Sequence, residues 1–114
     1  MPALFPYYLS LTAGILLGVM AQLMLKTGAE RTADVARQFL DPFTILGIGL
    51  YGLAAVFYIA AIKKIPISLA FPSVSLSYVV VAVVAHYAWG EPLGLPQLAG
   101  IALIACGIFF LHQV

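Results

Sequence analysis

The sequence predicts an all-α membrane protein with four transmembrane helices. Hydrophobic residues make up 64% of the chain, charged residues make up only 8%, and the mean hydropathy is +1.12, which is far above the range of soluble domains. Four apolar runs, at about 5–25, 43–62, 66–89 and 96–111, are each near the roughly 20 residues that a helix needs to cross the hydrocarbon core. Because the connections between them are short, we expect residues 1–114 to form a single transmembrane domain.

So small a bundle cannot easily surround a solute and also shield it from lipid. We therefore expect the working unit to be an oligomer, most simply a dimer. A net charge of +1 does not point to any class of partner, and we expect no nucleic-acid partner. The two ends of the bundle carry nearly equal numbers of positive charges. The positive-inside rule therefore predicts no orientation and permits an inverted partner.

The first apolar segment carries a stripe of residues at four-residue spacing, Gly14, Gly18, Gln22 and Lys26. The two glycines fit a helix-packing seam. Gln22 lies deep enough to need a hydrogen-bonding partner inside the bundle. Lys26 is either a headgroup anchor or, because it shares the stripe with Gln22, a contact for a polar ligand. No basic residue precedes this long apolar run, so we expect a retained helix and no cleaved signal peptide.

The connection at 27–41 is predicted to hold a short helix on the membrane surface. Asp41 followed by Pro42 is a typical helix start, with a capping acid before a proline at the first helical position. In the second segment Tyr51 and Tyr58 lie along one face. They are either packing or interfacial residues, or contacts for a ligand.

The third segment contains an internal proline, Pro72. Proline removes a backbone hydrogen bond and clashes with the preceding turn, so we expect a kink that opens a groove. Ser73 and Ser77 would place hydroxyls on that groove. Two lysines, Lys63 and Lys64, precede the segment. Glu91 follows it, in the turn before the last segment.

The fourth segment carries small residues on adjacent stripes, which we interpret as a contact surface for a second subunit. They are Ala99, Gly100, Ala102, Cys106 and Gly107. Cys106 is the single cysteine, so an intramolecular disulfide is excluded, and no clustered Cys or His predicts a metal site.

Acidic residues are missing from the middle of every apolar segment, where an ion would cost at least about 2.5–3.5 kcal/mol to insert. An exporter that exchanges a proton for an organic cation needs a buried carboxylate. No residue of this sequence is a candidate for it. No catalytic triad or phosphate-binding glycine loop is present either, so we expect no enzyme and no cofactor. Interior hydroxyls and amides flanked by cations suit a lipid with a phosphate headgroup.

Several motifs carry a resemblance over nearly the whole chain. They are Gly18-x-x-x-Gln22-x-x-x-Lys26, the run at 64–72, Ser75–Leu76–Ser77 and Trp89–Gly90–Glu91–Pro92, followed by Gly100 and Gly107. The chain resembles the four-helix members of the drug/metabolite transporter superfamily, in particular the subunits of the flippase for aminoarabinose-phosphoundecaprenol. It is also similar to the small multidrug resistance exporters, but Gly18 stands where their first helix carries an essential glutamate.

The resemblance implies a flippase, or a flippase subunit, that moves an undecaprenyl-phosphate-linked sugar across the bacterial inner membrane. It also implies pairing, possibly inverted, with itself or with a related four-helix subunit. The phosphate would contact Lys26 and also Lys63 or Lys64, which would have to converge near one membrane surface in the assembled protein. The sugar would contact Gln22, Tyr51, Tyr58, Ser73 and Ser77. Glu91 would pair with an amino group of the sugar or, more simply, with a lysine.

Two alternatives stay open on the residues alone. One is a small multidrug or metabolite exporter that works without an acid in its first helix. The other is an accessory membrane subunit that assists another protein.

Overall fold

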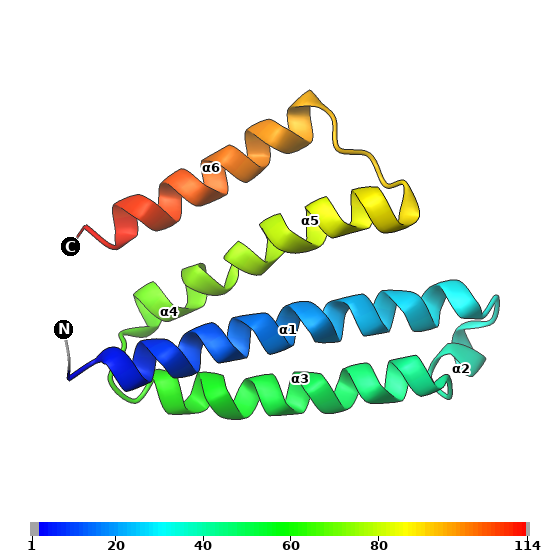
Figure 1. Ribbon diagram of the computed structural model, residues 1–114, viewed down its shortest axis with the longest axis horizontal. Helices are drawn as coiled ribbons and strands as arrows, with labels where there is room; N and C mark the ends of the chain where they lie inside the picture. The colour runs from blue at the N-terminus through cyan, green and yellow to red at the C-terminus, as the bar shows by residue number, and fades with distance from the viewer. Residues whose placement is uncertain (1–2, 114) are drawn as a thin grey trace.

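The computed structural model describes residues 3–113, and in this range the secondary structure is entirely helical (Figure 1). The helices are α1 (Phe5–Arg31), α2 (Val35–Gln38), α3 (Pro42–Ala61), α4 (Ile67–Val74), α5 (Leu76–Trp89) and α6 (Leu95–Leu111). Three stretches are long and apolar enough to cross a membrane, namely α1, α3 and the combined α4–α5, whereas α6 is a shorter apolar helix. The chain is thus an all-α membrane protein, as its composition predicts.

Helices α1 and α3 form the best-packed pair and run antiparallel along their full length (Figure 1). Small residues let the two backbones approach closely. A Cβ atom on buried Gly14 would lie 3.2 Å from the carbonyl oxygen of Ala54, and one on Gly47 would lie 3.1 Å from that of Ala21. Gly14 thus belongs to a packing seam, but Gly18 does not, because a Cβ atom there would meet nothing within 4 Å.

We predict that Gly47→Ala destabilises the protein by roughly 1–3 kcal/mol, the usual cost of overpacking a close contact. The added Cβ would lie 2.9 Å from Leu25 Cδ2 as well as against the α1 backbone. Gly49→Ala is the matched control on the same helix, where a Cβ meets open space. Thermal unfolding in detergent, followed by circular dichroism, compares the two. Equal thermal midpoints would show that α1 leaves room for a methyl group at Gly47.

The connection from α1 to α3 is fixed by the side chain of Asp41. This carboxylate caps α3 by accepting a hydrogen bond from the Phe43 backbone N–H (2.9 Å), which confirms the helix start predicted at Asp41–Pro42. Arg31 donates to it at 3.0 Å and also lies over the Phe43 ring. Burial alone raises the pKa of Asp41, but the hydrogen bonds from Arg31 and Phe43 and the Arg31 charge outweigh burial and leave the pKa below its ordinary value.

The third apolar segment consists of two helices. Helix α4 ends two residues after Pro72 and α5 begins at Leu76, so the segment is interrupted at Ser75. Nearby serines satisfy the backbone around the break. Both the backbone N–H and the hydroxyl of Ser75 donate to the Pro72 carbonyl, and Ser77 Oγ donates to the Val74 carbonyl at 2.7 Å.

Helix α6 lies at the edge of the molecule and buries none of its residues (Figure 1). It packs only loosely on α4 and α5. Cβ atoms on Gly100 and Gly107 would meet nothing within 4 Å, and Ala99, Ala102 and Cys106 are exposed. In this single chain the small residues of α6 contact no other helix closely, and their role in a subunit interface stays a prediction.

Candidate functional site

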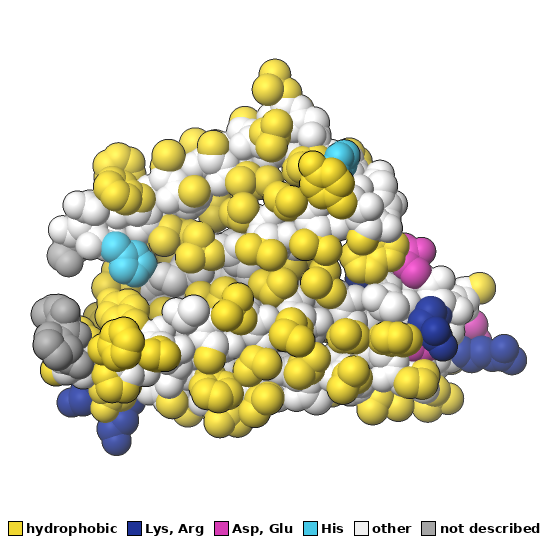
Figure 2. All heavy atoms as spheres, viewed as in Figure 1, with side chains coloured by type: hydrophobic (Ala, Val, Ile, Leu, Met, Phe, Trp, Pro, Cys, Tyr) yellow, Lys and Arg dark blue, Asp and Glu magenta, His cyan; other side chains and the backbone are white. Residues whose placement is uncertain are grey.

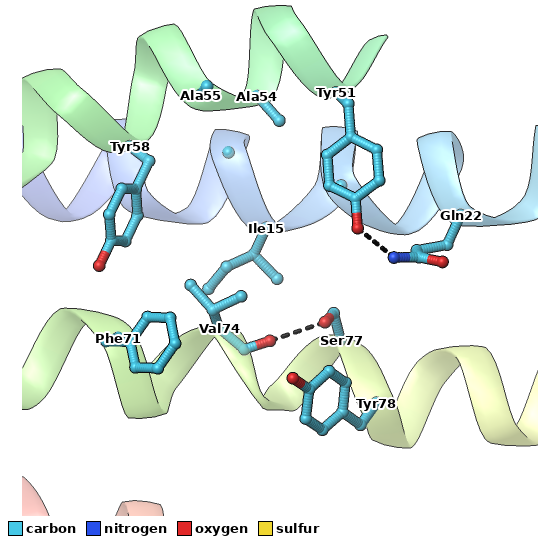
Figure 3. Close-up of a pocket in the computed structure, with 12 residues that line it drawn as sticks. Ile15, Gln22, Tyr51, Ala54, Ala55, Tyr58, Phe71, Val74, Ser77 and Tyr78 are labelled. Carbon is cyan, nitrogen blue, oxygen red and sulfur yellow. Dashed lines mark hydrogen bonds between the residues drawn. The ribbon is translucent and has the colours of Figure 1, made fainter. Parts of the chain in front are cut away.

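A cavity of about 300 Å³ lies between the α1–α3 pair and the broken helix α4–α5 (Figure 3). Helix α1 contributes residues of the stripe noted in the sequence, α3 contributes two tyrosines and two alanines, and the remainder comes from either side of the break at Ser75. The lining residues are Gly14, Ile15, Gly18, Gln22, Tyr51, Ala54, Ala55, Tyr58, Phe71, Val74, Ser77 and Tyr78. All of them are uncharged.

The cavity has few polar groups, and they differ in whether they already have hydrogen-bond partners. Gln22 Nε2 donates to Tyr51 Oη, which joins α1 to α3 (Figure 3). Ser77 Oγ already donates its proton to the Val74 carbonyl, so it can only accept from a ligand. The hydroxyl of Tyr58 is buried and has no hydrogen-bond partner within residues 3–113. An unsatisfied buried hydroxyl costs about 1–3 kcal/mol, and a ligand is one way to supply its partner.

Four aromatic rings also border the cavity, those of Tyr51, Tyr58, Phe71 and Tyr78 (Figure 3). Aromatic faces bind the apolar side of a ring-shaped ligand, and the hydroxyls of the three tyrosines can fix its orientation. This combination can hold a neutral, hydroxyl-bearing group. Within residues 3–113 no three His, Cys, Asp or Glu side chains gather as metal ligands would.

The structure brings four of the predicted sugar contacts together, Gln22, Tyr51, Tyr58 and Ser77. Ser73 is not among them. Its side chain is buried, donates to the Leu69 carbonyl at 2.7 Å and lies 3.4 Å from His112 Nε2, just beyond α6. The expectation that Ser73 faces the groove is therefore wrong for this conformation.

Sequence reasoning missed part of the cavity wall, chiefly Phe71, Val74 and Tyr78. Their spacing, at i, i+3 and i+7, is that of one helical face and was a usable signal. Gly18 was assigned to a packing seam, whereas it borders the open space of the cavity.

Lys26 lies one turn beyond Gln22 and is held by two carboxylates. Its Nζ is 2.9 Å from Glu30 Oε1 on the same helix and 3.2 Å from Glu91 Oε2 in the α5–α6 connection. Glu91 thus has the simpler of its two anticipated roles, an ion pair with a lysine. Two acids on one base leave this cluster with a net negative charge.

Lys63 and Lys64 lie at the other end of the molecule, in the turn between α3 and α4 (Figure 2). Both are exposed, and no ion pair to either occurs among the described residues. Because α1 and α3 are antiparallel and α3 is about 30 Å long at 1.5 Å per residue, Lys26 and Lys64 of one chain cannot contact the same phosphate. The expected convergence of these lysines is wrong within a single chain.

The four acidic residues of the sequence all lie at the Lys26 end (Figure 2). Glu30, Asp34 and Asp41 belong to the end of α1 and the connection to α3, and Glu91 is brought there by its pair with Lys26. Three cations share that end with four carboxylates. The Lys63–Lys64 end carries positive charge alone among the described side chains.

Comparison with known proteins gives consistent matches. The model of the EamA-like transporter family matches residues 2–112. Relatives described as probable 4-amino-4-deoxy-L-arabinose-phosphoundecaprenol flippase subunit ArnE include one from Enterobacter sp., 30% identical over 91% of this chain and 94% of the relative. Another, from Pectobacterium atrosepticum, is 32% identical over 92% of this chain and 96% of the relative. An ArnF subunit described in the same way, from Shewanella sediminis, is 36% identical over 85% of this chain and 70% of its own length. No solved structure matches the chain.

These matches agree with the fold. The apolar helices, together with the family and its flippase-subunit relatives, make this a multi-pass protein of the bacterial inner membrane. The family model spans nearly the whole chain, from before α1 to just past α6. The chain is a member of the EamA-like transporter family.

Proposed function

We propose that this protein is a flippase, or a subunit of one, that moves a sugar linked to a polyprenyl phosphate, such as undecaprenyl phosphate, across the inner membrane. The observation that carries the proposal is the uncharged cavity, which has aromatic walls and a hydroxyl without a partner. A sugar headgroup can stack on the rings and hydrogen-bond to the hydroxyls, while its lipid tail stays in the hydrocarbon around the bundle. The relatives named as aminoarabinose-phosphoundecaprenol flippase subunits support an aminoarabinose-like sugar.

The two groups of lysines suit the two end points of such a movement. The phosphate of a lipid starts at one membrane surface and finishes at the other, and Lys26 and the Lys63–Lys64 pair lie at opposite ends of the bundle. Each group can pair with a phosphate at its own surface. Within one chain this assignment replaces a single phosphate site made by Lys26 with Lys63 or Lys64.

A second four-helix subunit would complete the transporter. The relatives are named as subunits, and the cavity of this chain is bordered by exposed side chains such as Phe71 and Tyr78, 67% and 61% exposed, which a partner would cover. The open face of α6, with Gly100 and Gly107, supports a helix contact there. Whether the partner is a second copy or a related chain follows from co-purification of tagged subunits.

Transport of a fluorescent glycosyl-phosphoprenol in vesicles tests the proposal. We expect the wild-type protein, with its partner if one is needed, to expose the label to a membrane-impermeant quencher. Lys26→Ala should slow transport of the label by about tenfold, and so should the double change of Lys63 and Lys64 to Ala. Each variant removes a charge-assisted contact to the phosphate. Unchanged transport in both variants would exclude the phosphate contacts.

The same vesicles separate the rival functions. Proton flux that depends on a quaternary ammonium compound would favour a drug exporter, which the uncharged cavity does not support. Stable co-purification with a larger enzyme, without binding of lipid or solute, would identify an accessory subunit instead.

A further inference from the structure

The ion pair between Lys26 and Glu91 joins two halves of the molecule that share no other polar side-chain contact among the residues that the structure describes. Within residues 3–113 it is the one side-chain hydrogen bond or ion pair that connects α1 and α3 to the half formed by α4, α5 and α6. The cavity lies between these same halves. Breaking this pair therefore removes the single polar side-chain tie between the two halves in the described part of the chain.

The pair lies just past one end of the cavity. Gln22 lines the cavity at that end, and Lys26 follows it by four residues, about 6 Å along α1. A ligand whose neutral headgroup contacts Gln22 and Tyr51 would bring an attached anionic group to Lys26. In the structure the Glu91 carboxylate occupies that position, 3.2 Å from Lys26 Nζ.

Glu91 is the partner that can leave. Glu30 is four residues from Lys26 on the same helix and stays within reach of it. Glu91 instead lies in the connection before α6, just after Gly90, and this connection has no regular structure until Leu95. Its backbone is held to the end of α5, since its N–H donates to the Ala85 carbonyl (3.4 Å) and its carbonyl accepts from His86 Nδ1 (2.8 Å). The side chain can thus swing away without unwinding α5.

We propose that Glu91 is an internal substitute for the anion of the substrate. In the empty protein Glu91 holds the end of α5 against α1 through Lys26. A prenyl-phosphate group that enters beside Gln22 takes Lys26 from Glu91, and the two halves separate at this end. The ligand drives the change because it binds Lys26 only when Glu91 has left. This inference rests on the proposed function for the identity of the anion.

The separation can be measured with two spin labels in the full chain, reconstituted in phosphatidylcholine nanodiscs. The labels are placed by Ala33→Cys after α1 and Leu95→Cys at the start of α6, both exposed, with Cys106→Ser removing the native thiol. The probes are geranylgeranyl phosphate and geranylgeraniol, which differ only in the phosphate. We expect the phosphate, but not the alcohol, to lengthen the distance between the labels.

Variants of the two carboxylates provide matched controls. Glu91→Gln should show the long distance without any ligand and should bind geranylgeranyl phosphate about two- to fivefold more tightly, the range expected from an exposed ion pair. Glu30→Gln should keep the short distance until the phosphate is added, because it leaves the Lys26–Glu91 pair intact.

The outcomes also distinguish this inference from the proposed function. Binding of the phosphate with no change in distance, or a short distance in Glu91→Gln, overturns the role of Glu91 and leaves transport untouched. Failure of the phosphate to bind either protein overturns the exchange at Lys26. The transport assay with the wild-type protein then decides separately whether the flippase proposal falls as well.

Discussion

Gly18→Leu is expected to slow transport strongly while leaving the fold intact. Gly18 borders the cavity, and a Cβ atom there meets no other atom within 4 Å, so the larger side chain enters the open space and does not push α1 from α3. Leucine also favours a helix over glycine by up to about 1 kcal/mol. The vesicle assay should show at least about a tenfold loss, since each 1.4 kcal/mol of lost ligand binding is a factor of ten.

The control for this variant is Gly49→Leu on α3. Gly49 is also open to a Cβ atom and lies outside the cavity, so the same substitution should leave transport unchanged. Thermal midpoints of both variants at or above the wild-type value would show that both are folded. Wild-type transport by Gly18→Leu would mean that the headgroup takes another route.

The contrast between Gly14 and Gly18 shows what the sequence could predict here. Four-residue spacing places both glycines, with Gln22, on one face of α1, and that face does meet α3 and the cavity. Which glycine packs and which stays open depends on where α3 crosses α1. The crossing is set by tertiary contacts such as Gly14 against Ala54, which spacing alone does not encode.

Ser73 and Ser77 show the limit of a prediction from spacing. Residues four apart in a helix lie near one face, so both serines are expected on the groove. Here Ser77 reaches the cavity, whereas Ser73 lies outside the lining and packs toward α6. The sequence predicts a kink at Pro72, but where the edge of the cavity-facing side falls depends on how α4 and α5 pack against the other helices.

The lysines show an inference that the sequence did permit. Consecutive spans of a helical membrane protein alternate in direction, so Lys26 after the first span and Lys63–Lys64 after the second lie at opposite surfaces. Within one chain that alternation excludes the expected convergence, which would require an inverted second subunit. By contrast, local rules sufficed for the capped start of α3 at Asp41, which depends only on neighbouring residues.

Tyr58→Phe should stabilise the empty protein and weaken binding of the sugar. Among the described residues the buried Tyr58 hydroxyl has no partner, so its removal relieves a desolvation cost and raises the free energy of unfolding by roughly 1 kcal/mol. In the complex the same hydroxyl would bond to the sugar, and its loss should weaken binding of a glycosyl-phosphoprenol by about two- to tenfold. Thermal unfolding in detergent and a binding titration measure the two effects.

Tyr51→Phe is the matched control, because it makes the same chemical change seven residues earlier on α3. The Tyr51 hydroxyl accepts a hydrogen bond from Gln22 Nε2, so its loss leaves that amide without its partner and should lower stability. The two substitutions are therefore expected to shift the thermal midpoint in opposite directions. If both lower it, the Tyr58 hydroxyl has a partner within the protein, and a ligand is not needed to satisfy it.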